Sequence, residues 1–273
     1  MKKYSFLLSI ILSTSFLACK SDTKKNDKKE ENKEPESEWV NLFNGENLDG
    51  WIPKFYHHEV GENYANTFRV KDSIIQVNYS DYDEFNERYG HLFYKEPFSS
   101  YHLKFEYRFT DEWMEDAPDY AYRNSGVMFH SQAPETILKE QDWPISVEYQ
   151  MLADAGDGEP RPTGNMCSPG TEVFFEGEMD PRHCIESSSD TYPLEEWVQA
   201  ELIVYGDSLV IHKVNGEKVL EYTKPQIGGG VVSGYDPETK EDGKPLTEGY
   251  IALQAEGQGV EFKEIRIKKI GND

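Results

Sequence analysis

The stretch from Tyr101 to Phe109, Tyr-His-Leu-Lys-Phe-Glu-Tyr-Arg-Phe, has an apolar side chain at every odd position and a polar one at every even position. Successive side chains of a β-strand point to opposite sides, so this alternation is typical of a strand with one buried face. The run from Ile145 to Met151 repeats the pattern and places Glu148 and Gln150 together on its polar side. Both runs therefore predict strands that cover a core.

Turn signals separate the other apolar runs. Asn215-Gly216 lies between residues 210–214 and 218–220, and Gly206-Asp207 lies between residues 202–204 and 209–211, which predicts two hairpins. Helical periodicity is nearly absent, apart from a possible turn near residues 135–141. A propeller would need a repeat of about forty residues, and none is found. We therefore predict an all-β jelly-roll β-sandwich.

The N-terminal residues predict export. Residues 1–18 combine Lys2 and Lys3 with an apolar run at 6–17, the plan of a signal peptide that is too short to span a bilayer. Residues 16–19, Phe-Leu-Ala-Cys, resemble the bacterial lipobox and so predict lipidation of Cys19. The alternative is a plain signal peptide cleaved near Ala18, with Cys19 as a spare thiol. A lipid-anchored location in the cell envelope, at the outer membrane or in the periplasm, is the expectation.

Residues 19–38 contain almost only Lys, Asp, Glu, Asn, Ser, Thr and Pro after Cys19, and so predict a disordered tether. Residues 39–273 show no second linker and predict a single domain. The chain has a formal net charge of −23, and the tether is nearly neutral, so the charge belongs to the domain. Such a surface repels phosphate backbones and anionic lipid, which argues against nucleic acid as a partner and leaves the lipid anchor as the only membrane contact. The charge can also serve solubility alone.

Two cysteines remain in the predicted domain, Cys167 and Cys184. In an oxidising compartment an even pair most simply forms a disulfide, which stabilises the fold by about 3 kcal/mol. A zinc site is the rival interpretation, although the spacing lacks a Cys-x-x-Cys pair. The disulfide would bring residues 163–170 close to residues 182–184 and hold His183 above a groove. A histidine there can transfer protons or bind a sugar, or it can be an ordinary surface residue beside a structural bridge.

Polar side chains that alternate with core positions are the first candidates for a binding site, because one face of a sandwich sheet can line a groove. Each such residue alone is more often an ordinary half-exposed polar residue, so the hypothesis depends on their convergence. The candidates from this pattern are Glu148, Gln150, His130, Arg123, Asn124, His212 and Gln254.

Several motifs resemble one known family. Residues 41–51, Asn-Leu-Phe-Asn-Gly-Glu-Asn-Leu-Asp-Gly-Trp, are similar to the opening motif of the 3-keto-disaccharide hydrolase family, also called the 3-keto-glucoside lyase/hydratase domain. Further similar motifs follow in the family's order across nearly the whole predicted domain, at residues 124–127, 147–151, 163–165, 196–198, 214–216 and 249–254. One departure is that Ala255-Glu256-Gly257 stands where many members carry Asp-His-Gly, so no histidine role is carried over to that position.

The resemblance implies a concanavalin-like jelly roll that acts on an oxidised oligosaccharide or glycoside, whose C3 hydroxyl an upstream glycoside 3-dehydrogenase has converted to a ketone. The ketone acidifies the C2 hydrogen, so the C1 substituent can leave by β-elimination to give a 2-hydroxy-glucal, and water then adds back. Glu148 or His183 is the expected base, Arg123 or a divalent cation the electrophile, and His130 or another carboxylate the acid. The expected substrate-binding residues are Asn124, Gln150, Thr163, His212 and Gln254.

Two other functions stay open. A non-catalytic carbohydrate-binding lipoprotein could use Trp51, Trp113, Trp143 or Trp197 for stacking, although aromatic residues in a sandwich are more often core. Retaining glycoside hydrolysis needs two facing carboxylates, and Glu148 has no acid two or four residues further along its strand.

The sequence predicts no certain cofactor. The one candidate is a divalent cation. Residues 154–159, Asp-Ala-Gly-Asp-Gly-Glu, have the oxygen ligands and glycines of a calcium loop without the EF-hand spacing, and they can equally form a polar turn.

Overall fold

The computed structural model describes residues 38–271. The chain divides into a segment at Met1–Glu36 and a compact unit at Ser37–Asp273. The predicted signal peptide, the lipidation site Cys19 and the predicted tether up to residue 37 lie outside the described residues and stay predictions. Within residues 38–271, no helix has both the length and the apolar composition needed to cross a membrane.

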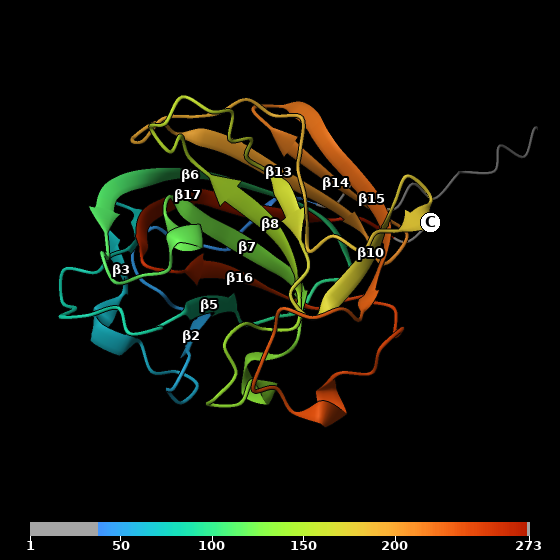
Figure 1. Cartoon of the computed structure of the whole chain (residues 1–273), viewed down its shortest axis with the longest axis horizontal. Helices are drawn as coiled ribbons and strands as arrows, with labels where there is room; N and C mark the ends of the chain where they lie inside the picture. The colour runs from blue at the N-terminus through green and yellow to red at the C-terminus, as the bar shows by residue number, and fades with distance from the viewer. Residues whose placement is uncertain (1–37, 272–273) are drawn as a thin grey trace, which may run out of the picture. The chain divides into compact units, whose positions relative to one another are not determined.

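Two antiparallel sheets form the described unit, which confirms the predicted all-β sandwich (Figure 1). The larger sheet has ten strands, in the order β11 (Glu178–Met179), β10 (Thr171–Phe175), β15 (Glu217–Ile227), β14 (Leu209–Val214), β13 (Val198–Tyr205), β6 (Ser100–Trp113), β17 (Gln258–Lys269), β4 (Ile74–Val77) and β3 (Phe68–Lys71), with β1 (Val40–Asn41) also paired to β17. The smaller sheet has seven, in the order β12 (Cys184–Ile185), β9 (Asn165–Cys167), β8 (Val147–Leu152), β7 (Asn124–Ser131), β16 (Tyr250–Ala255), β5 (Gly90–Tyr94) and β2 (Trp51–Phe55).

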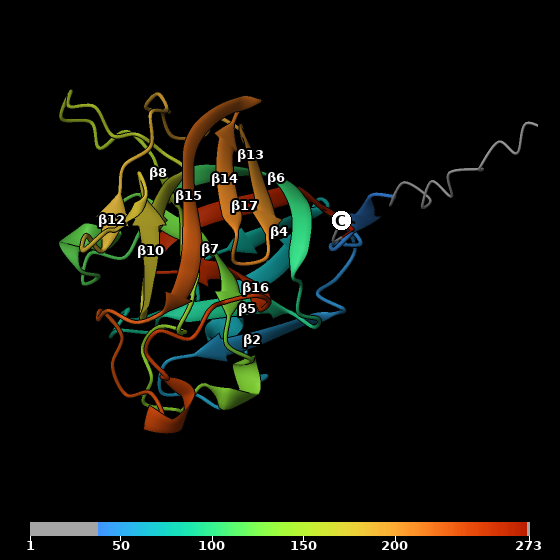
Figure 2. The same ribbon diagram turned by 90° about the vertical axis from the view of Figure 1, so that its right-hand side faces the viewer.

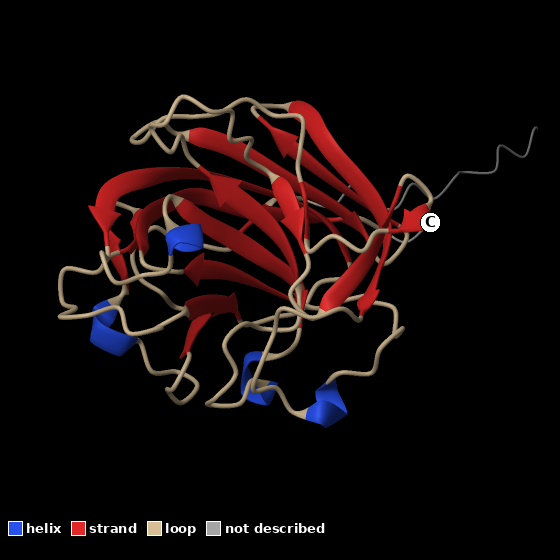
Figure 3. Ribbon diagram, viewed as in Figure 1, coloured by secondary structure: helices blue, strands red, loops and turns tan. Residues whose placement is uncertain are grey.

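Between residues 38 and 271, helical structure is confined to four short 3-10 turns in the connections between strands (Figure 3). They are η1 (Tyr64–Asn66), η2 (Asp119–Ala121), η3 (Pro134–Thr136) and η4 (Pro237–Thr239). The turn predicted near residues 135–141 corresponds to η3, which is shorter than expected and begins one residue earlier.

Strand β6 is central to the larger sheet, as the alternation at residues 101–109 predicts. All five odd-numbered side chains of that stretch are at most 2% exposed and belong to the core between the sheets. Full burial of a large apolar side chain contributes roughly 1.5–3 kcal/mol. Strand β6 pairs with β13 on one side and β17 on the other.

The two hairpins predicted from turn residues are both present. Strand β13 pairs with β14, and β14 pairs with β15 around Asn215 and Gly216. These two residues have φ angles of 48° and 87°, the left-handed values that a two-residue turn between antiparallel strands requires.

Strands β16 and β17 follow each other in the sequence but belong to different sheets, as their two red ribbons in Figure 2 show. The chain crosses from one sheet to the other at Glu256 and Gly257, where Gly257 N donates to the Tyr79 hydroxyl at 2.7 Å. This crossing places Glu256 directly after the end of β16, an interior strand of the smaller sheet.

The face of the smaller sheet that is turned away from the larger sheet, here called the outer face, is partly covered. Phe93, Met128 and Ala252 form a second apolar cluster there with Ile137, which comes from the segment between β7 and β8. Trp143, from the same segment, packs against this cluster. The uncovered part of the outer face lies beside Glu148 and carries the candidate site.

Candidate functional site

A hollow of about 310 Å³ opens on the outer face of the smaller sheet. Its walls come from β7, β8 and β9, from the segments that hold Trp143 and His183, and from the turn after β16. The lining residues are Tyr120, Asn124, Trp143, Glu148, Gln150, Cys167, Pro169, His183, Val231 and Glu256. We call this hollow the sheet pocket.

Glu148 is held in the sheet pocket by strand pairing and by a glycine. Strand β8 pairs with β7 so that Gly126 lies opposite Gln150 and Met128 opposite Glu148. A side chain at position 126 would overlap the Glu148 carboxyl group, so only glycine leaves room for it. Burial, and then the nearby Glu256 carboxyl, raise the pKa of Glu148 well above its ordinary value.

Glu256 supplies a second carboxyl group to the sheet pocket. Its Oε1 accepts a hydrogen bond from Trp143 Nε1 at 2.9 Å, and its buried Oε2 has no protein partner. Burial raises the pKa of Glu256 to about 7, although the Trp143 bond acts in the opposite direction. The sequence argument against a carboxylate pair considered only the strand of Glu148 and therefore missed Glu256. The sequence does contain a signal for Glu256. It continues the alternation of β16, in which Ala252 and Gln254 also alternate with core residues.

Aromatic rings form one wall. Trp143 lies beside Tyr89, with ring centroids 4.6 Å apart, and the Tyr89 and Tyr120 hydroxyls are 2.8 Å apart. Of the four tryptophans considered for stacking, Trp143 alone lines the sheet pocket. Trp51 is a core residue, Trp113 lies beside Tyr122, and Trp197 packs under Arg108 and Lys263.

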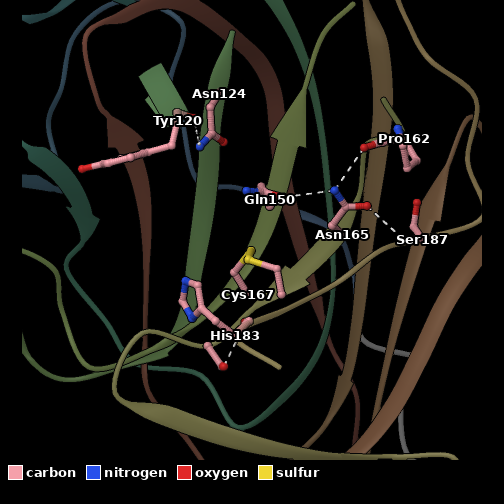
Figure 4. Close-up of a disulfide and its surroundings, with 10 residues drawn as sticks. Tyr120, Asn124, Gln150, Pro162, Asn165, Cys167, His183 and Ser187 are labelled. Atoms are coloured by element: carbon pink, nitrogen blue, oxygen red, sulfur yellow. Dashed lines mark hydrogen bonds between the residues drawn. A yellow bond between two sulfur atoms is a disulfide. The ribbon is translucent and has the colours of Figure 1, made fainter. Parts of the chain in front are cut away.

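Amide side chains lie on the neighbouring strands β7, β8 and β9 (Figure 4), and two of them, Asn124 and Gln150, line the sheet pocket. Gln150 Oε1 accepts from Asn165 Nδ2 at 3.0 Å, and Asn165 Oδ1 accepts from the backbone of Ser187 at 2.9 Å. Asn124 Nδ2 donates to the carbonyl of Tyr120 at 3.1 Å, which leaves its buried Oδ1 without a protein partner. Asn124 and Gln150 both line the sheet pocket, and their contact with substrate stays a prediction.

The disulfide between Cys167 and Cys184 is present and joins β9 to β12, whose registers place these residues opposite each other. His183 immediately precedes the bridge, and its carbonyl accepts from Ser168 N and Oγ, each at 3.0 Å. Its ring lines the sheet pocket, and its buried Nδ1 has no protein partner. Burial lowers the pKa of His183, so the imidazole is neutral near pH 7 and free to accept a proton.

His130 was expected in the groove but does not line the sheet pocket. It has a φ of 47°, and the register of β7 with β16 shifts between Tyr250 and Ala252. This bulge breaks the alternation after Met128. The ring instead contacts the Gly206 carbonyl of the β13–β14 turn at 3.0 Å, and burial lowers the His130 pKa to about 4.

His212 and Thr163 are core residues, so the expectation that they contact substrate is not supported by their positions. The His212 ring lies 2.9 Å from both the Gly164 carbonyl and the Tyr222 hydroxyl, because its strand turns Val210, His212 and Val214 inward. The Thr163 hydroxyl lies 2.6 Å from the Tyr107 hydroxyl and is fully buried.

Arg123 and Gln254 also lie outside the sheet pocket lining. The Arg123 guanidinium donates to the Asp154 carbonyl, lies over the Tyr122 ring and lines a different hollow beside Trp113. Gln254 points to the outer face, as predicted, but it is 1% exposed and its Oε1 has no protein partner.

In the part of the chain that the structure describes, no grouping of three close ligand side chains suits a cation that prefers oxygen ligands. Among the described residues, the grouping of three close ligand side chains consists of His183 and the two disulfide-bonded cysteines. In the loop at 154–159, Asp154 and Asp157 accept hydrogen bonds from the backbone of Gly156 and Glu159, as in a polar turn.

The outer face of the smaller sheet thus carries a pocket of carboxyls, amides and aromatic rings, which are groups that carbohydrate-active proteins use to bind sugars. The chain belongs to the 3-keto-alpha-glucoside-1,2-lyase-like domain family, whose sequence profile matches residues 38–268. This confirms the resemblance seen in the sequence motifs. A search of curated proteins found no match.

Solved structures agree on the fold. Two crystal structures from Parabacteroides distasonis, both with a provisional glycosyl hydrolase assignment, align with TM-scores of 0.51. The first is 20% identical and covers 85% of this chain and 94% of its own. The second is 18% identical and covers 85% of this chain and 100% of its own. At these identities the likeness shows the fold alone.

Proposed function

We propose that this protein cleaves 3-keto-glycosides by β-elimination to a 2-hydroxy-glucal, followed by rehydration. The observation that carries the proposal is the pair of buried carboxyls, Glu148 and Glu256, in one pocket with a neutral His183. Like charges in a buried site disfavour double ionisation, so the pair retains a proton near neutral pH.

The three groups match the needs of the elimination. The negative charge develops on the C3 oxygen, and a buried protonated carboxyl group can stabilise it by donating a hydrogen bond. Glu148 has this role, because the Trp143 hydrogen bond favours ionisation of Glu256 instead. Arg123 has no role in this mechanism, because it lines the hollow beside Trp113 and not the sheet pocket.

His183 is the base in this mechanism. Its neutral ring takes the C2 proton, and the electron pair of the C2–H bond forms the C1–C2 double bond as the C1 oxygen leaves. The imidazolium then returns the proton to that oxygen, and the ionised Glu256 stabilises the imidazolium while it exists. Water adds to the resulting enone to complete net hydrolysis.

Incubation of the purified mature protein with methyl 3-keto-glucoside tests this function, since the enone absorbs ultraviolet light. Glu148→Gln and His183→Gln should each lower kcat by roughly 10²–10⁴-fold, the typical contribution of a group that transfers a proton or stabilises an oxyanion. Wild-type turnover by the double variant would contradict the roles of both residues. The substrate must come from an enzyme that oxidises a C3 hydroxyl group.

The presence of Glu256 also favours a second candidate, direct hydrolysis of an unoxidised glycoside, because that reaction uses two carboxyl groups. The substrate for this test is methyl glucoside, the unoxidised counterpart of methyl 3-keto-glucoside. Release of methanol from methyl glucoside without any enone would favour direct hydrolysis. Binding of sugars without either product would favour a carbohydrate-binding lipoprotein.

A further inference from the structure

A third side chain with a metal-binding atom lies beside the disulfide of Cys167 and Cys184 (Figure 4). The two sulfur atoms and a ring nitrogen of His183 all lie within 4.8 Å of one another. Two cysteines and one histidine occur together as the ligands of Zn²⁺ in proteins, with the fourth position of the ion open to a small ligand. In the oxidised protein the two sulfur atoms are bonded to each other, so neither is available as a thiolate.

Backbone contacts hold the two cysteine-bearing strands together independently of the disulfide. The register of β12 with β9 continues past the cysteines to the pair of Ile185 and Met166. Ser168 donates to the His183 carbonyl through both its N and its Oγ, each at 3.0 Å. We therefore expect the two thiols of the reduced protein to stay close to each other and to the His183 ring.

The charges around Cys167 favour a cation. Among the described residues, the lining of the sheet pocket includes the carboxyls of Glu148 and Glu256 and no lysine or arginine. Glu148 is the register partner of Cys167 across β8 and β9, so the two side chains point to the same face of the sheet. The charge of Arg182, two residues before the second cysteine, is balanced by Asp180, whose Oδ2 lies 2.6 Å from it.

We propose that reduction of the disulfide creates a zinc site whose ligands are the thiolates of Cys167 and Cys184 and the imidazole of His183. A dithiol reductant supplies the two electrons and two protons. One of its thiolates attacks the bridge to form a mixed disulfide, and its second thiol completes the exchange, so the reductant leaves as a disulfide. Cys184 is more exposed than Cys167, so its sulfur is the one attacked. Zn²⁺ then replaces the thiol protons, which pass to water.

The ligand atoms need to move little to surround the ion. Bonds of about 2.3 Å to sulfur and about 2.0 Å to nitrogen place the ligand atoms of a tetrahedral Zn²⁺ roughly 3.5–3.8 Å apart. The histidine nitrogen, which lies within 4.8 Å of both sulfur atoms, therefore has to approach them by about 1 Å at most. Strand β12 has two residues and lies at the end of the smaller sheet, so it can make this shift without disturbing the other strand pairs.

An ion bound in this way engages the His183 ring and so removes the base of the proposed elimination. This consequence rests on the proposed function, whereas the metal site itself does not. Reduction alone leaves the ring free, so turnover stops when reduction and Zn²⁺ act together.

Titration with Co²⁺ tests the site, because the absorption of this ion reports both thiolate ligands and tetrahedral geometry. The protein is the Cys19→Ser form, in which Cys167 and Cys184 are the remaining cysteines. After reduction and removal of the reductant without oxygen, it should bind one Co²⁺ per chain with a thiolate spectrum, and Zn²⁺ should displace the Co²⁺. The oxidised protein should give no such spectrum. Identical spectra before and after reduction, or no thiolate spectrum in the folded reduced protein, would overturn the site.

Variants then assign the ligands. His183→Gln should weaken Zn²⁺ binding by at least about tenfold, since even groups that only orient a ligand contribute about 10–100-fold to affinity. Cys167→Ser/Cys184→Ser should abolish the thiolate spectrum. His102→Gln is the matched control, because this histidine contacts Glu201 on the larger sheet. Unchanged affinity in folded His183→Gln would remove the histidine from the site.

Circular dichroism checks the fold of the reduced, metal-free protein. If that protein is unfolded, one equivalent of Zn²⁺ should restore the fold, because an ion that binds the folded state stabilises it. Failure of Zn²⁺ to restore the fold would count against the site as much as a missing thiolate spectrum.

Enone formation separates the metal site from the proposed function. Zn²⁺ should stop turnover by the reduced protein and not by the oxidised protein, and a chelator should return the reduced protein to its metal-free rate. Equal inhibition of both forms would contradict the link to His183. If neither form produces enone without metal, the proposed function has failed, and the Co²⁺ spectrum decides the metal site by itself.

Discussion

Trp143 Nε1 donates a hydrogen bond to Glu256 Oε1 across 2.9 Å and thereby joins the segment between β7 and β8 to the turn after β16. These two parts of the chain are more than a hundred residues apart. The bond holds one oxygen of Glu256 and leaves the other, Oε2, without a protein partner at the sheet pocket.

Trp143→Phe should raise the pKa of Glu256 above about 7, since the substitution removes the hydrogen bond that favours the ionised carboxylate. NMR titration with labelled glutamate measures this shift directly, and the lower limb of the pH–rate profile should move to higher pH. Trp113→Phe, in a different hollow, serves as the control. An unchanged titration in Trp143→Phe would mean that the bond has no electrostatic effect.

Glu256→Gln should change how stability depends on pH. The folded pKa of about 7 lies above the ordinary value of 4.5, so Glu256 destabilises the folded state increasingly as pH rises from 4.5 to 7. The variant should gain about 3 kcal/mol relative to wild type between pH 4.5 and pH 8. Urea unfolding at both pH values measures the difference, with the exposed Glu135→Gln as control. A constant difference between variant and wild type would refute the raised pKa.

Gly126→Ala should destabilise the protein by roughly 1–3 kcal/mol, because the added methyl group overlaps the Glu148 carboxyl. The double variant Gly126→Ala/Glu148→Ala should recover most of this loss. Gly230→Ala, where the methyl group meets open space and φ is not positive, is the control for stability. No recovery in the double variant would place the strain elsewhere.

Replacement of Cys167 and Cys184 by serine should lower the free energy of unfolding by about 3 kcal/mol, because the unfolded chain loses its loop constraint. Activity should also fall, since the bridge holds β12 and the adjacent His183 at the pocket. Reduced wild-type protein should match the double variant in denaturant unfolding. Equal stability of oxidised and reduced wild type would show that the bridge contributes little.

Cys19→Ser should abolish incorporation of a fatty-acid label and release the protein from the membrane fraction, because the lipobox-like motif then lacks its acceptor thiol. Labelling of cells that express each form measures this, and the Cys167→Ser/Cys184→Ser variant should still be labelled. Absence of label on the wild type would instead support a plain signal peptide.

Local alternation and turn chemistry predicted the strands at 101–109 and 145–151, the hairpin at Asn215-Gly216 and the outward direction of Glu148 and Gln150. These features depend on residues that are close together in the sequence, so the sequence of a single strand or turn is enough to predict them. The pairing of Cys167 with Cys184 followed from their number and expected compartment, and the structure confirmed it.

Only the tertiary structure decided which polar residues meet. Glu256 reaches Glu148 because β16 lies beside β7, which lies beside β8, and the chain leaves that sheet directly after β16. His130 points away because one bulge breaks its strand, and His212 faces the core because the whole of β14 turns that side inward. Alternation gives each strand two faces, but the packing of the two sheets determines which face is buried and which strands are neighbours.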